Sequence, residues 1–65
     1  MCESTIYLLK AGKETKVMDD AAKVTVDEHG VTVTSILVDK KQFGRAVIKE
    51  VDLMHHRIIL EEISE

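Results

Sequence analysis

The sequence predicts an all-β fold: a small, strongly bent antiparallel barrel of five or six strands, broadly SH3-like or Sm-like. Three observations support this class. β-branched residues occur in short runs, turn signals recur at the spacing of roughly 8–12 residues typical of small barrels, and the apolar alternation changes phase within two long runs. Strands that bend sharply around a short barrel need such shifts. A chain of 65 residues makes one domain, residues 1–65.

The first two strands are predicted to form a hairpin. Ser4–Lys10 is expected to be a strand, and Lys10-Ala11-Gly12-Lys13 a tight turn in which Gly12 supplies the positive φ. Lys13–Met18 is expected to return as a second strand. Its polar residues at positions 13–16 favour a place at the edge of the sheet.

A third strand is predicted at Ala21–Asp27, where alternation directs Val24 and Val26 toward the core. The sequence Asp27-Glu28-His29-Gly30 is the strongest turn signal in the chain. We expect His29 to be a turn residue that tolerates an unusual φ.

A fourth strand is predicted at Val31–Val38. Val31 and Val33 are expected to face inward, and a one-residue shift of phase precedes Ile36 and Val38. A bulge of this kind would let one long strand bend around the barrel.

The fifth run, Phe43–Met54, shows the same shift. Its apolar residues change face at Lys49-Glu50, which favours a β-bulge, and a helix over residues 47–51 is the alternative. His56–Glu61 is expected to be the last strand.

The composition indicates a folded but thin core. The apolar content is 45%, and the absence of Pro and of low-complexity tracts argues against disorder. A chain of this length buries only about 60% of the surface that its unfolded form exposes. Small domains compensate with disulfides, a metal or association. Because one cysteine cannot form an internal disulfide, the sequence favours dimerisation, a metal, or both.

The expected location is the cytoplasm, without membrane association. The longest early apolar run, residues 6–9, is too short for a signal peptide or a membrane span. A lone thiol stays reduced in the cytoplasm. The net charge of −3 disfavours nucleic acid as a partner, because its binders normally present a basic face.

The main candidate functional residue is Cys2, which we interpret as a metal ligand. An initiator methionine is generally removed before a small residue, and the amine and thiolate of an amino-terminal cysteine would close a five-membered chelate ring. These groups titrate near pH ~8 and ~8.5, so a divalent ion of borderline softness can displace both protons at neutral pH. The backbone amide of Glu3 can supply a further donor. Such donors favour square-planar Ni(II) or Cu(II) over tetrahedral Zn(II), and two chains meeting at their amino termini would complete four ligands. The alternative is that Cys2 is a small, partly buried residue without function.

The other candidates carry weaker signals. His55-His56 is similar to a metal-binding pair, but adjacent strand residues point to opposite faces, so both imidazoles could bind one ion only from a turn. An exposed, inert turn pair is the alternative. The sequence contains no glycine-rich phosphate loop, no Cys-x-x-Cys motif and no recognisable nucleophile, so we expect no enzymatic activity.

Two alternative functions remain open. The first is RNA binding through a basic patch, although such residues more often form a solvated face; the patch would consist of Lys40, Lys41, Arg45 and Lys49. Barrel proteins that read single strands stack bases on aromatic rings, and this chain has only one Tyr and one Phe. The second is a structural interaction module whose exposed edge at Lys13–Met18 pairs with a partner strand.

Several segments together carry a resemblance to a known family. They are the opening residues 1–8 (MCESTIYL), Gly12, Gly30-Val31, and residues 45–53 (RAVIKEVDL) and 56–61 (HRIILE). This joint pattern resembles the CooT-like proteins, small nickel-binding accessory proteins associated with maturation of carbon monoxide dehydrogenase. One departure is the lack of a glycine in Leu37–Lys41, where a glycine-containing turn is expected after the fourth strand.

The resemblance implies a small β-barrel homodimer that binds Ni(II) through Cys2, with Glu3 contributing at most its backbone amide. The function it implies is that of a metallochaperone or nickel buffer for maturation of a nickel enzyme, with carbon monoxide dehydrogenase as one client. Related sequences have also been labelled predicted RNA-binding proteins.

Overall fold

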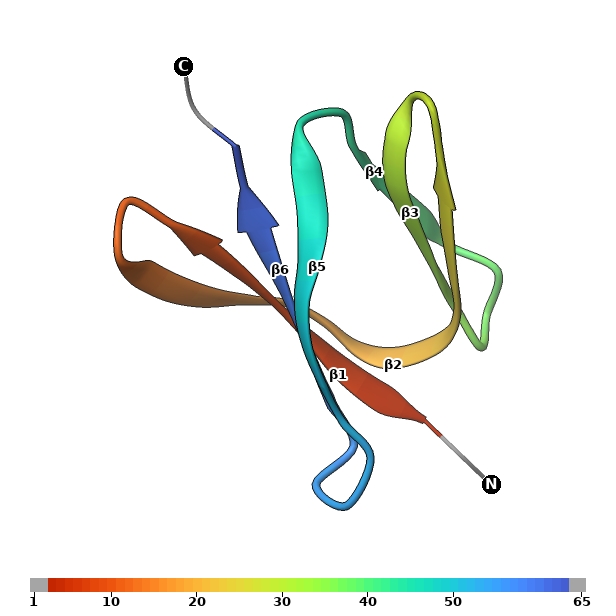
Figure 1. The fold of residues 1–65 in the computed structure, drawn as a ribbon. Coiled ribbons are helices and arrows are strands. Elements are labelled where there is room, and N and C mark those ends of the chain that lie inside the picture. The colour runs from red at the N-terminus through yellow and green to blue at the C-terminus, as the bar shows by residue number, and fades with distance from the viewer. Residues whose placement is uncertain (1–2, 64–65) are drawn as a thin grey trace.

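The computed structural model describes residues 3–63, which contain six strands and no helix. The strands are β1 (Ser4–Lys10), β2 (Lys13–Asp27), β3 (Gly30–Ser35), β4 (Lys40–Phe43), β5 (Ala46–Asp52) and β6 (Arg57–Glu62). They form one sheet in the order β4-β3-β2-β1-β6-β5, which curls into an incomplete barrel (Figure 1). The predicted all-β class and the small, bent, six-stranded barrel are confirmed. No helix among residues 3–63 is long and apolar enough to cross a membrane.

One strand pair corrects the prediction of antiparallel pairing throughout. β1 and β6 are parallel, with Thr5 opposite Arg57 and Leu9 opposite Glu61. The other four pairs are antiparallel. A short hairpin imposes antiparallel pairing on neighbours in the sequence, whereas β1 and β6 are separated by the whole middle of the chain and are free to pair in parallel.

The two strands predicted at Lys13–Met18 and Ala21–Asp27 form a single strand, β2. Register shifts at its centre, on both the β1 side and the β3 side, bend it so strongly that its halves contact different neighbours (Figure 1). Pairing with β3 begins only at Ala21. Among the described residues, the segment Lys13–Val17 therefore has no strand on its side away from β1, which confirms its predicted edge character.

Of the two predicted phase shifts, one is a bulge and the other is the end of a strand. Ile48 is opposite Leu60 and Glu50 is opposite Ile59, so Lys49 is the additional residue of a bulge in β5 and the helical alternative is excluded. The predicted strand over Val31–Val38 instead ends at Ser35.

The turns are mostly as predicted. Ala11 and Gly12 both have positive φ, 53° and 79°, which confirms the tight turn between β1 and β2. His29 lies in the β2–β3 turn as predicted, but its expected unusual φ is wrong, because the positive φ there belongs to Gly30 (113°).

The core lies inside the curl of the sheet. Its fully buried large side chains are Ile6, Val31, Val33 and Leu60. Val24 packs against this core as predicted. Val26 shares the face of Val31, its register partner, but is 60% exposed, because it lies one residue from the end of the hairpin, where the incomplete barrel does not cover it.

Candidate functional site

The candidate ligand Cys2 lies outside the described residues, and the structure shows only the chain that follows it. Glu3 is exposed and Ser4 begins β1. The Thr5 N–H donates a hydrogen bond of 2.8 Å to the His56 carbonyl. The start of β1 is thereby joined to the turn between β5 and β6, at the lower end of the molecule in Figure 1.

This β5–β6 turn contains both candidate histidines. A position in a turn is the one from which both imidazoles could bind one ion. The Asp52 carboxylate accepts hydrogen bonds from His55 Nδ1 (2.9 Å) and from the His55 backbone N–H (3.1 Å). His56 has a φ of 54°. Residues 3–63 contain no cluster of three or more His, Cys, Asp or Glu side chains arranged to hold a metal ion. A ligand role for the pair therefore has no support from neighbouring side chains in this range.

We predict that His55→Ala raises the pKa of Asp52. The side-chain hydrogen bond from His55, followed by its backbone hydrogen bond, lowers this pKa below its ordinary value. The carboxylate therefore stabilises the folded state above about pH 3.9, the unfolded pKa, and this contribution is lost as pH falls through the lower folded pKa. Carboxyl-carbon NMR should show a higher midpoint in His55→Ala, with His56→Ala as the unchanged control. An unaltered midpoint in His55→Ala would contradict the assigned cause.

The four residues of the predicted basic patch are distributed over β4, the β4–β5 turn and β5. Lys40 and Lys41 are adjacent on β4 and point to opposite faces. Lys41 Nζ donates a hydrogen bond of 3.0 Å to the Val17 carbonyl. Arg45 is in the β4–β5 turn and Lys49 is the bulge residue of β5. RNA binding through these residues stays a prediction.

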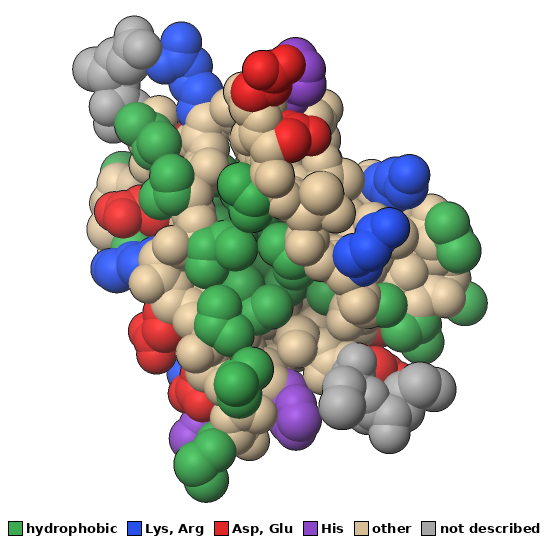
Figure 2. Space-filling model, turned by 45° about the vertical axis from the view of Figure 1, so that its right-hand side comes forward, with side chains coloured by type: hydrophobic (Ala, Val, Ile, Leu, Met, Phe, Trp, Pro, Cys, Tyr) green, Lys and Arg blue, Asp and Glu red, His purple; other side chains and the backbone are tan. Residues whose placement is uncertain are grey.

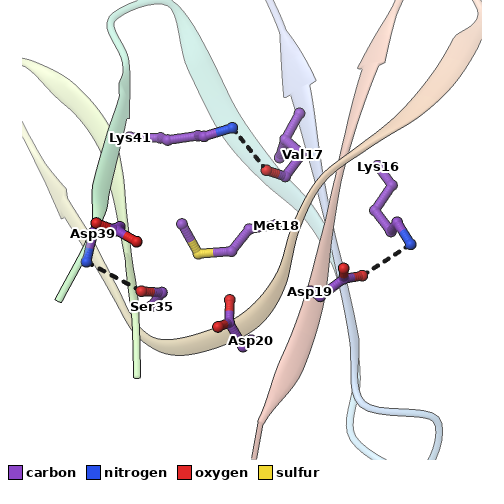
Figure 3. A pocket seen from close by; sticks show the side chains of 8 residues that line it. All are labelled: Lys16, Val17, Met18, Asp19, Asp20, Ser35, Asp39 and Lys41. Carbon is purple, nitrogen blue, oxygen red and sulfur yellow. Dashed lines mark hydrogen bonds and ion pairs between the residues drawn. The ribbon is translucent and has the colours of Figure 1, made fainter. Parts of the chain in front are cut away.

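The structure contains a cavity of about 410 Å³ between β2 and the loop from β3 to β4 (Figure 3). The sequence did not predict this cavity. Its lining comes from three separate segments: Lys16, Val17, Met18, Asp19, Asp20, Ser35, Asp39 and Lys41. The one sequence feature that pointed to this region was the polar segment Lys13–Met18, which predicted an exposed edge of the sheet.

Ser35 shapes the far wall of this cavity. Its hydroxyl oxygen accepts hydrogen bonds from the N–H groups of Leu37 and Asp39, both at 3.1 Å. Its backbone N–H donates to the Asp39 carbonyl and its carbonyl accepts from Val38. Four hydrogen bonds to one buried residue fix a loop in which Val38 has a φ of 69°, a conformation that β-branched residues rarely adopt.

The opposite wall carries an ion pair on β2. Lys16 Nζ lies 2.9 Å from Asp19 Oδ1, and the hydrogen bond and charge of this carboxylate raise the pKa of Lys16. Both side chains are more than half exposed, so the pair contributes little to stability. The ion pair instead acts on the position of Lys16, because Asp19 holds the Lys16 ammonium at one side of the cavity.

The chain is similar to known proteins over nearly its whole length. The sequence matches the family described as "CO dehydrogenase accessory protein CooT" over residues 1–61. A crystal structure assigned to CooT from Carboxydothermus hydrogenoformans is similar to this chain, with a TM-score of 0.85 and 28% sequence identity over 97% of this chain and 100% of that one. No curated protein matches the chain. The matched range includes Cys2 and Glu3.

Proposed function

Because the chain belongs to the CooT family of CO dehydrogenase accessory proteins, we propose that it is a non-enzymatic nickel-binding protein that acts as a metallochaperone or nickel buffer. Its client would be a nickel enzyme undergoing maturation, and carbon monoxide dehydrogenase is the first candidate. The observation that carries the proposal is the family match across residues 1–61, a range that includes Cys2, the proposed ligand.

The proposed ligands are the amine and thiolate of Cys2 after removal of Met1, with the Glu3 backbone amide as a further donor. An amine, a thiolate and an amide nitrogen favour the square-planar geometry of Ni(II). The hydrogen bond between Thr5 and the β5–β6 turn supports this proposal, because it fixes the position of the chain three residues after Cys2.

We propose a homodimer in which two Cys2 residues bind one ion. Exposed apolar surface supports this association, because monomeric proteins rarely leave large apolar patches uncovered. Figure 2 shows hydrophobic side chains gathered along one face. The four most exposed large apolar side chains among residues 3–63, each more than 70% exposed, are Leu37, Val38, Leu53 and Met54. They lie in the β3–β4 loop and the β5–β6 turn. The turn is bonded to the start of β1, and the loop is bonded to β2 through the Ile36 N–H and the Asp20 carbonyl.

Titration with Ni(II) of protein shown by intact mass to lack Met1 tests this function. We expect thiolate-to-nickel absorption that saturates at one ion per two chains. Cys2→Ser should weaken binding by more than about 100-fold, since even an outer-shell partner costs about 10–100-fold. Ser4→Ala is the control and should bind like the wild type.

A second comparison isolates the amine. Protein that retains Met1 has an amide in place of the free cysteine amine, so it should bind nickel more weakly while keeping the thiol. Equal binding by Cys2→Ser and the wild type would refute the thiolate site, and equal binding by protein with and without Met1 would refute the amine as a ligand.

A further inference from the structure

The first half of β2 presents an unpaired backbone edge. In an antiparallel pair every second residue directs its N–H and C=O away from the partner. Segment Lys13–Val17 pairs with β1 on one side and, among the described residues, with no strand on the other. The Val17 carbonyl is accessible to a donor from outside the β1–β2 pair, because it accepts a hydrogen bond of 3.0 Å from the Lys41 side chain.

The cavity of about 410 Å³ lies directly beside this edge, since Lys16 and Val17 belong to its lining. In Figure 3 the carboxylates of Asp20 and Asp39 point into it from two sides, with the Met18 side chain between them. Neither carboxylate forms an ion pair with another residue in the range 3–63. The cavity thus offers two carboxylates without an ion-pair partner among residues 3–63, together with an apolar floor.

Neither of the two lysines beside the cavity forms an ion pair with these carboxylates. Lys16 is held by Asp19 at 2.9 Å. Lys41 extends from β4 across the cavity mouth and places its ammonium 3.0 Å from the Val17 carbonyl (Figure 3). The Lys41 contact shows that the Val17 carbonyl at this edge accepts a cationic side chain that approaches from β4.

We propose that the edge Lys13–Val17 and this cavity together bind a basic, extended peptide segment of a partner protein. The segment adds as a strand to β2, and one of its lysine or arginine side chains enters the cavity between Asp20 and Asp39, with its aliphatic stem on Met18. Strand addition supplies affinity through the backbone, and pockets for alternate side chains supply specificity. The net charge of −3 favours a basic partner. This proposal rests on residues 13–41 and does not depend on the proposed nickel function.

The test is an NMR titration of the isotope-labelled full chain with an acetylated and amidated heptapeptide of alternating arginine and valine. We expect saturable shifts confined to Lys13–Val17 and the cavity. Asp20→Asn/Asp39→Asn should weaken binding by at least about tenfold, because charge-assisted hydrogen bonds are the strong ones. Lys41→Gln should strengthen it by about threefold or more, because it removes the competing ammonium.

Two controls separate this site from general charge attraction. Glu28→Gln/Glu50→Gln changes the net charge by the same amount at two exposed positions away from the cavity and should bind like the wild type. A peptide with glutamate in place of arginine should not bind.

The proposal is overturned if the two double variants weaken binding equally or if Lys41→Gln weakens it. It is also overturned if the shifts fall on the β4 or β5 edges, or if the arginine peptide gives no saturable binding.

Discussion

Gly30→Ala is expected to unfold a large part of the protein at 25 °C. A Cβ at this position would lie 2.2 Å from the Phe43 carbonyl oxygen and 2.9 Å from the Gly44 Cα, both of which are backbone atoms that cannot move aside alone. The φ of 113° is also one that side chains rarely adopt. Relief of the overlap would separate the β2–β3 turn from the β4–β5 turn, and β3 contributes two of the fully buried core residues.

The expected cost is more than about 3 kcal/mol, at the upper end of what single substitutions do. A 65-residue chain has a total stability of roughly 3–10 kcal/mol at ordinary values per residue. The loss is therefore comparable with the whole stability, and urea unfolding followed by far-UV circular dichroism should show it directly.

Gly12→Ala is the matched control. Gly12 also has a positive φ, 79°, but a Cβ there meets nothing within 4 Å. Its substitution carries only the conformational penalty of about 1–2 kcal/mol. The difference between the two variants isolates the contact with Phe43 and Gly44, and equal destabilisation of both would show that this contact has no effect.

Local sequence signals predicted most of this fold because they act between near neighbours. The Ala11-Gly12 turn, the bulge at Lys49 and the inward valines of β3 all follow from residues a few positions apart. The parallel β1–β6 pair does not, because no turn chemistry specifies contact between the two ends of the chain. The end of β3 at Ser35 also had no strong marker, since the loop after it is fixed by the Ser35 side chain and contains no glycine or proline.

The candidate sites divide in the same way. Cys2 could be proposed from sequence because its amine and thiolate belong to one residue and need no folding to come together. The cavity beside β2 could not, because Met18, Ser35 and Lys41 meet only after β2 bends and the β3–β4 hairpin folds over it. The alternation of apolar and polar residues predicted that Val26 faces the core. Its exposure instead depends on where the curled sheet ends.

Leu60→Ala is expected to lower the free energy of unfolding by about 2–5 kcal/mol. Leu60 is fully buried on β6, where it is opposite Leu8 of β1 and Ile48 of β5. Both neighbours are held by strand pairing, so the sheet cannot collapse into the space that the truncation leaves. Val26→Ala shortens a side chain that is 60% exposed and is not part of the apolar surface proposed for association, and it should cost less than about 1 kcal/mol.

The same pair of variants distinguishes a metal site made by one chain from a site made by two. A chelate within Cys2 alone binds nickel equally in the folded and unfolded chain, so it adds no stability to the folded state. A site shared by two folded chains does add stability, by about 2.7 kcal/mol at a free nickel concentration 100 times the dissociation constant. Urea unfolding of Leu60→Ala with and without nickel should then show recovery of much of the lost stability if two chains share the ion. Unchanged unfolding under saturating nickel would assign the ligands to a single chain. A Leu60→Ala cost no larger than that of Val26→Ala would contradict the buried position of Leu60 itself.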